Sequence, residues 1–267
     1  MSFPPSRTLP PLLHADDLKW HAPTEDLHFW TCTDPTAARW IVKLRGGFYA
    51  VRERAFSVIA QALDISCQSS TFLKMPPRRK PWPIPAQRSG STDVYQLAIW
   101  LLDEHPQPSH CDNCPLPELN AQFAKRPYDL EVLRRSRVSM LLDWARGEML
   151  GMLCEMHEPP GQLFTADHAF VQIDNELMFC RAAGADLRDS PWIIDDARRI
   201  RPSGLDEAIR LCEQVLSLSD DVYQDAIRMP EGYKPRMLWS VRKQIGLIRP
   251  RARDFLEWAA PKRQHIG

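Results

Sequence analysis

The sequence predicts an α+β protein of two lobes, a small N-terminal lobe of strands and one helix and a larger, mostly helical C-terminal lobe. Three observations lead to this prediction. Short aromatic and β-branched runs, typical of strands, precede residue 75. A proline-rich stretch, residues 75–90, cannot be helical and would interrupt a sheet. Apolar residues at helical spacing dominate the rest of the chain. We therefore expect lobes of residues 1–95 and 96–267.

The composition excludes several classes of protein. With 44% hydrophobic and 25% charged residues in 267, the chain can build a sizeable core and is neither collagenous nor disordered. Lysine and arginine, 34 together, balance 34 aspartates and glutamates, so the net charge is zero. A protein without an overall positive field does not gather nucleic acid or acidic lipid, which argues against nucleic acid as its main partner.

Two further features indicate the cellular compartment. No apolar run approaches the roughly 18 residues of a membrane span, and the first residues lack the apolar core of a signal peptide. The seven cysteines are odd in number and mostly scattered, which fits reduced thiols better than a disulfide framework. We expect a cytoplasmic protein that does not bind membranes.

The N-terminal lobe begins with a predicted hairpin. Residues 27–32 and 38–44 are aromatic and β-branched runs separated by an Asp-Pro turn, which is typical of paired strands. Two glycines then end the pattern, and from Val51 apolar residues recur at helical spacing for about three to four turns. The residues around Leu73 favour a further strand.

The C-terminal lobe is predicted to be helical with one exception. Residues 170–173 form a short β-branched run that is followed directly by carboxylates, so chemistry is easiest to place there. Helices are expected at residues 94–102, 130–156, 205–216, 222–227 and 236–258.

Lys43 and Glu53 form the first candidate site. Alternation along the predicted strand places Lys43 on the same face as Ile41, and Glu53 follows ten residues later near the start of the predicted helix. A strand and a packed helix at this distance can bring the two side chains into an ion pair. In kinases such a pair holds a lysine for nucleotide phosphates. The alternative is a strand-edge lysine in solvent and a glutamate favoured by the helix dipole.

The second candidate site surrounds the strand at residues 170–173. Asp167 and His168 precede this strand, and Asp174, Asn175 and Glu176 follow it. Carboxylates at the two ends of a small hairpin could share a divalent cation with phosphate oxygens, and hard oxygen ligands favour Mg²⁺ or Mn²⁺. The alternative is that Asp167 caps a helix and that Asp174 and Asn175 form a turn.

Several segments together resemble the HipA-like kinases, bacterial relatives of the protein kinases and phosphatidylinositol kinases. The order of these segments carries the resemblance, which covers most of the chain. It implies a kinase-like fold with ATP in the cleft between the lobes. The segments are residues 40–44, 52–56, 59–65, 165–168, 172–179 and 218–230.

The resemblance implies a role for each candidate residue. Lys43 would contact ATP phosphates and Glu53 would orient it. Asp167 would act in the catalytic loop and Asp174 would hold the metal. Phosphoryl transfer needs charge neutralisation and alignment more than covalent help, so these residue types suit it. The implied function is ATP- and Mg²⁺-dependent phosphotransfer to a protein Ser/Thr hydroxyl, with a small-molecule hydroxyl as the alternative acceptor.

Two departures from the family pattern keep a pseudokinase open. No asparagine lies between Asp167 and Asp174, so His168, Asn175 or Glu176 would have to complete the metal site. Residues 31–38 contain no glycine, so a glycine-rich phosphate loop is absent upstream of the lysine. A pseudokinase would bind nucleotide or a protein partner without catalysis.

Cys111 and Cys114 form a Cys-x-x-Cys pair that could contribute two thiolates to a zinc ion. A structural zinc site needs four ligands, and no second close pair exists in the sequence. The pair is therefore also consistent with a surface turn that carries ordinary thiols.

Overall fold

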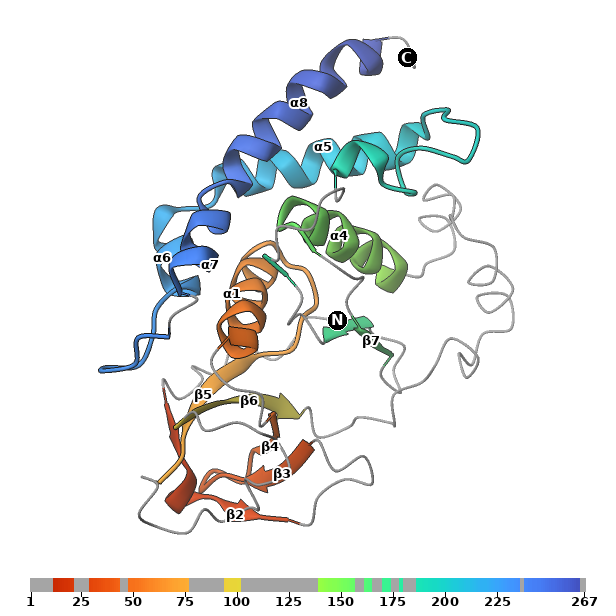
Figure 1. Ribbon diagram of the computed structural model, residues 1–267. Coiled ribbons are helices and arrows are strands. Elements are labelled where there is room, and N and C mark those ends of the chain that lie inside the picture. The colour runs from red at the N-terminus through yellow and green to blue at the C-terminus, as the bar shows by residue number, and fades with distance from the viewer. Residues whose placement is uncertain are drawn as a thin grey trace.

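The structure is a computed structural model that describes residues 12–21, 29–43, 48–76, 94–101, 139–156, 161–164, 170–173, 178–179, 186–235 and 238–264. Within this part of the chain, a twisted sheet lies at one end of the molecule and most of the helices lie at the other (Figure 1). The expected α+β class is confirmed.

The sheet has six strands in the order β1-β5-β6-β4-β3-β2. All neighbours are antiparallel except β1 and β5, which are parallel. The predicted hairpin is present as β3 and β4, and the predicted strand around Leu73 is β5. The strands are β1 (Leu13–His14), β2 (Lys19–Trp20), β3 (Phe29–Thr33), β4 (Arg39–Lys43), β5 (Ser70–Lys74) and β6 (Tyr95–Leu101).

Asp34 closes the turn between β3 and β4. Its Oδ1 accepts hydrogen bonds from the backbone N–H groups of Thr36 at 2.8 Å and Ala38 at 3.0 Å. Its Oδ2 accepts one from the indole of Trp40 at 3.0 Å. These bonds to the charged form hold the pKa of Asp34 below its usual range despite burial, which opposes them. One aspartate therefore satisfies the turn and fixes the register of the hairpin.

The strand β6 corrects the expectation of a helix at residues 94–102. It lies between β5 and β4, and its residues from Gln96 to Ile99 are buried whichever face they point to. A strand that is buried on both faces lacks the alternation of apolar and polar residues. The periodicity of such a short apolar run therefore does not distinguish a strand from a buried helix. The sheet accordingly extends beyond residue 95.

The helices are arranged around α1, which packs on the sheet and on α6 and α7, while α5 and α8 lie side by side (Figure 1). The single helix expected at residues 236–258 is two helices, because Gly246 and Leu247 form a turn. A short hairpin of two strands contacts α4. These elements are α1 (Phe48–Ala62), α4 (Ser139–Leu153), β7 (Gly161–Phe164), β8 (Phe170–Ile173), α5 (Pro202–Ser217), α6 (Asp220–Ala226), α7 (Leu238–Ile245) and α8 (Ile248–Gln264).

The two faces of the sheet belong to different apolar cores. Phe72 and Leu97 face the main core, which contains α1 and the other helices. Val42 and Leu73 face a second, smaller core that includes Leu13. The helices therefore pack on the face of the sheet to which Phe72 and Leu97 point. No helix in the described part of the chain is long and apolar enough to cross a membrane.

A buried carboxylate connects α4 to the segment before α5. Glu148 accepts hydrogen bonds from the indole N–H groups of Trp144 at 2.9 Å and Trp192 at 2.6 Å. The helix α5 approaches this segment so closely that a Cβ on Gly204 would lie 1.7 Å from the carbonyl oxygen of Trp192. Only glycine allows this packing.

We expect Gly204→Ala to lower the free energy of unfolding by about 3 kcal/mol, because the added methyl group forces α5 away from Trp192. Urea unfolding followed by circular dichroism measures this difference. Gly246→Ala is the matched control, since its Cβ would meet only the carbonyl oxygens of Arg242 and Lys243 at 3.5 Å. Equal unfolding midpoints for the two variants would contradict the close approach at Gly204.

Candidate functional site

Lys43 lies at the end of β4, on the face of the sheet that α1 covers. It is the cross-strand partner of Leu97, which is in turn the partner of Phe72. Directly opposed residues in antiparallel strands share a face, so Lys43 faces the main core with these two apolar side chains. Its side chain and backbone together are only 6% exposed.

Glu53 supplies the opposite charge from α1. It lies in the second turn of the helix and is 3% exposed. The Lys43 Nζ donates hydrogen bonds to Glu53 Oε1 at 3.0 Å and to Oε2 at 2.9 Å. The ion pair predicted from the sequence spacing is confirmed, and the alternative of a solvent-exposed lysine is wrong. Burial makes this contact stronger than a surface pair and makes the loss of either partner costly.

The position of Glu53 depends on how α1 is held. Its inner face, including Phe56 and Ile59, is fully buried against the sheet and the helices. On the side of α6, Arg54 lies 4.0 Å from Asp225 and its guanidinium lies 5.9 Å from the ring centre of Phe72. Burial lowers the pKa of Arg54, and the nearby Asp225 opposes that shift. The helical part of the molecule thus contacts α1 both on its inner face and at Arg54, the residue next to Glu53.

Outside the described residues lie the other predicted site residues, which are Asp167, His168, Asp174, Asn175 and Glu176. Cys111 and Cys114 also lie outside them. The strands next to the predicted site residues are described. The β7–β8 pair is antiparallel and places Phe164 opposite Phe170, so residues 165–169 connect the two strands of a hairpin. Asp174 directly follows the last residue of β8. Among the described residues, no three His, Cys, Asp or Glu side chains gather as a metal site.

A second, partly buried charged cluster, which the sequence analysis did not single out, lies between α4 and α5. Arg146 donates hydrogen bonds to the carbonyl oxygen of Leu63 at 2.8 Å and to the side chain of Gln214 at 2.7 Å, and lies 3.5 Å from Glu207. Burial raises the pKa of Asp143 to about 6, with Glu207 adding to the shift and Arg146 opposing it. Asp143 and Arg146 are neighbours on α4, and Glu207 joins them only because α5 packs against α4.

Comparison with known proteins supports one conclusion about the fold. No model of a known protein family matches this sequence, and no curated protein is detectably similar to it. The crystal structure of the Helicobacter pylori proinflammatory kinase CtkA matches with a TM-score of 0.53 and 9% identity, over 91% of this chain and 99% of that chain. This chain has a kinase-like fold. The fold expected from the resemblance to HipA-like kinases is thereby confirmed.

A second solved structure is more distant. It is the Shewanella oneidensis MR-1 toxin–antitoxin complex of HipA, HipB and operator DNA, which matches with a TM-score of 0.43 and 10% identity. The match covers 85% of this chain and 60% of that chain. At these identities the similarity concerns the fold alone.

We expect removal of one partner of the buried pair to be costly and removal of both to be much less so. Lys43→Met or Glu53→Leu alone leaves an uncompensated charge in the core and should lower the free energy of unfolding by about 3–5 kcal/mol. The double variant Lys43→Met/Glu53→Leu should recover most of that loss, since two apolar side chains replace the two charges. Urea unfolding of the four proteins gives the coupling energy.

The exposed pair of Arg198 and Asp189, at 2.8 Å, is the matched control for this cycle. Its coupling should stay below about 1 kcal/mol, because both side chains are solvated. A coupling energy for Lys43 and Glu53 as small as that of the surface pair would show that the two charges do not depend on each other.

Asp143 generates a prediction about pH. Its pKa is about 6 in the folded protein against an ordinary value of 3.8, so the folded state holds the proton more tightly. Stability therefore falls as the pH rises through this interval and stays lower above it. We expect Asp143→Asn to raise the free energy of unfolding at pH 7.5 by about 1–2 kcal/mol, after allowance for solvent screening, and to change it little at pH 4.

Urea unfolding at the two pH values tests this, with the exposed Asp196→Asn as control. An equal effect of Asp143→Asn at both pH values would exclude ionisation of Asp143 as the cause.

Proposed function

We propose that this protein is an ATP- and Mg²⁺-dependent phosphotransferase. The observation that carries the proposal is the buried ion pair between Lys43 on a sheet strand and Glu53 on the packed helix, in a chain with a kinase-like fold. In protein kinases a strand lysine and a helix glutamate must pair for the enzyme to be active. CtkA, which shares the fold, is described as a kinase.

The proposed role of Lys43 follows from its chemistry. An ammonium group held by a bidentate contact points in a fixed direction, so it can neutralise nucleotide phosphates without first being ordered. Glu53 would orient the ammonium group. In the transition state of phosphoryl transfer, negative charge is spread over the oxygens of the transferred group. A cation held in a partly water-excluded site stabilises that charge and so raises the rate.

The hairpin of β7 and β8 would supply the remaining groups. We propose that Asp174, with Asn175 or Glu176, holds Mg²⁺, and that Asp167, with His168, acts on the acceptor side. Support comes from the sequence positions of the two aspartates at opposite ends of β8 and from the preference of Mg²⁺ for carboxylate oxygens. The metal would neutralise charge on the transferred group.

The acceptor we propose is a protein Ser/Thr hydroxyl, with a small-molecule hydroxyl as the alternative. The zero net charge of the chain supports either over a nucleic acid. A cytoplasmic location is supported by the free cysteines in the described part of the chain, Cys32, Cys67, Cys154 and Cys212. Burial raises the pKa of Cys32 and of Cys212 to about 12, so these thiols stay protonated and unreactive.

A pseudokinase that binds nucleotide without turnover is the second candidate. It is favoured by the absence of asparagine between Asp167 and Asp174. It is also favoured by the turn before the lysine strand, which Asp34 closes with its side chain and which contains no glycine. Backbone N–H groups in that turn are already bonded to Asp34 and cannot cradle phosphate there.

We expect ATP to raise the melting temperature of the protein, and to raise it further in the presence of Mg²⁺, because ligand that binds only the folded state stabilises it. The double variant Lys43→Met/Glu53→Leu should lose the shift. Asp174→Ala should keep an ATP shift but lose its Mg²⁺ dependence. Asp167→Ala should keep both shifts and lose phosphate transfer, measured as incorporation from γ-labelled ATP, because its contact is made in the transition state.

The Arg199→Gln variant, which changes an exposed arginine on a distant turn, is the control and should match the unmodified protein. An ATP shift without ATP consumption at millimolar Mg²⁺ would identify a pseudokinase. No ATP shift under any condition would rule out both candidates.

A further inference from the structure

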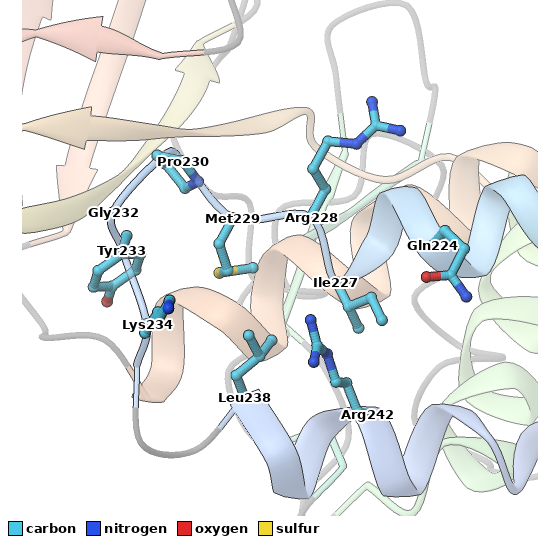
Figure 2. Close-up of a pocket in the computed structure, with 10 residues that line it drawn as sticks. All are labelled: Gln224, Ile227, Arg228, Met229, Pro230, Gly232, Tyr233, Lys234, Leu238 and Arg242. Carbon is cyan, nitrogen blue, oxygen red and sulfur yellow. The ribbon is translucent and has the colours of Figure 1, made fainter.

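A pocket of about 460 Å³ lies between the end of α6, residues 227–235 and the start of α7 (Figure 2). We call it the α6–α7 pocket. Its charged lining residues are Arg228, Lys234 and Arg242, and Ile227, Met229 and Leu238 form much of its apolar wall. We propose that the α6–α7 pocket binds a phosphate monoester with an apolar organic part.

The charge of the pocket is the first argument. None of the described residues that line it is acidic. Asp225 lies beside the pocket and pairs with Arg228 at 3.2 Å, and Arg54 also approaches this carboxylate, so its charge is already shared. Over the described ranges, neither Lys234 nor Arg242 has a carboxylate within ion-pair distance. The pocket therefore has two cations available for an anion.

Some arginines of the described surface are already paired with carboxylates at hydrogen-bond distance, for example Arg198 with Asp189 and Arg199 with Asp195, each at 2.8 Å. Lys234 and Arg242 differ from these in lining one pocket together with apolar side chains. In Figure 2, the side chain of Arg242 extends from α7 toward Ile227, while the side chain of Arg228 extends away from Ile227. We accordingly assign the anion contacts to Arg242 and Lys234. A guanidinium can give a phosphate two parallel hydrogen bonds, whereas an ammonium contributes a point charge.

The wall of the pocket is held in place by the sheet. The ring of Tyr233, which is 8% exposed, lies 4.4 Å from the ring of Tyr95 on β6 and 5.7 Å from that of Phe72 on β5. The Tyr95 hydroxyl donates a hydrogen bond to the carbonyl oxygen of Glu231 at 3.3 Å. Gly232 has a φ of +78°, which allows the chain to reverse at this point. A wall anchored in this way needs little ordering when a ligand binds.

The size and the wall of the pocket define the ligand class. Its volume falls within the range of small-molecule sites and exceeds what one phosphate group fills. Inorganic phosphate would leave the apolar wall of Ile227, Met229 and Leu238 in contact with water. A phosphate monoester satisfies both parts, since its dianion meets Arg242 and Lys234 while its organic part covers the apolar side chains. Lys43 does not line this pocket, so the site is separate from the one proposed for ATP.

Phenyl phosphate is a suitable probe, and its binding can be measured by ³¹P line broadening and by calorimetry at pH 7.5. We expect phenyl phosphate to bind the full chain more tightly than inorganic phosphate does, and phenol not to bind detectably. Arg242→Gln and Lys234→Gln should each weaken binding of phenyl phosphate about tenfold to a hundredfold, the usual cost of losing a charged hydrogen bond.

Lys243→Gln is the matched control. It removes the same charge from the next position of α7, where the ammonium lies 5.6 Å from the ring centre of the exposed Trp239, and should leave the affinity unchanged. Equal losses in Lys243→Gln and Arg242→Gln, inorganic phosphate binding as tightly as phenyl phosphate, or no binding to the unmodified protein would each overturn the proposal. The variant Lys43→Met/Glu53→Leu should still bind phenyl phosphate, which separates this site from the proposed ATP site.

Discussion

The buried contact between Lys43 and Glu53 is the constraint around which the sheet and the helices are organised. Two charges removed from water are tolerated only if each stays within hydrogen-bond distance of the other. Lys43 belongs to a central strand, so its position follows from the register of β4 with β6. Glu53 belongs to α1, which must therefore keep one position and one rotation on the sheet. The apolar residues of α1 stabilise the same placement, because they fill the core between the sheet and the helices.

The C-terminal helices extend this constraint across the molecule. The helix α1 is in contact with α6 and α7 as well as with the sheet (Figure 1). Arg54 approaches Asp225 of α6, and Tyr233 packs on Phe72 and Tyr95 of the sheet. The segment between α6 and α7 therefore packs on elements that also contact the helix carrying Glu53. The α6–α7 pocket lies in that segment.

Much of the fold follows from local patterns. The hairpin of β3 and β4 has alternating side chains and an Asp-Pro turn, and α1 has apolar residues at helical spacing, so both are predictable from the sequence. The strand β6 is not, because residues 95–101 are nearly all apolar and their pattern fits a buried helix equally well. The break between α7 and α8 is also missed, since a single glycine within a helical pattern is often tolerated.

By itself the sequence determined the α+β class, the strand and helix that carry Lys43 and Glu53, and the separation that lets these two residues meet. These are local properties, which depend on residue type and spacing along a few turns or strands. Only the tertiary structure decided that the pair is buried and that Glu207 lies close to Asp143 and Arg146. It also decided that Lys234 and Arg242 line one pocket, where the described part of the chain gives them no carboxylate partner. Burial and the meeting of charges depend on which elements pack together, and packing joins residues that no sequence period relates.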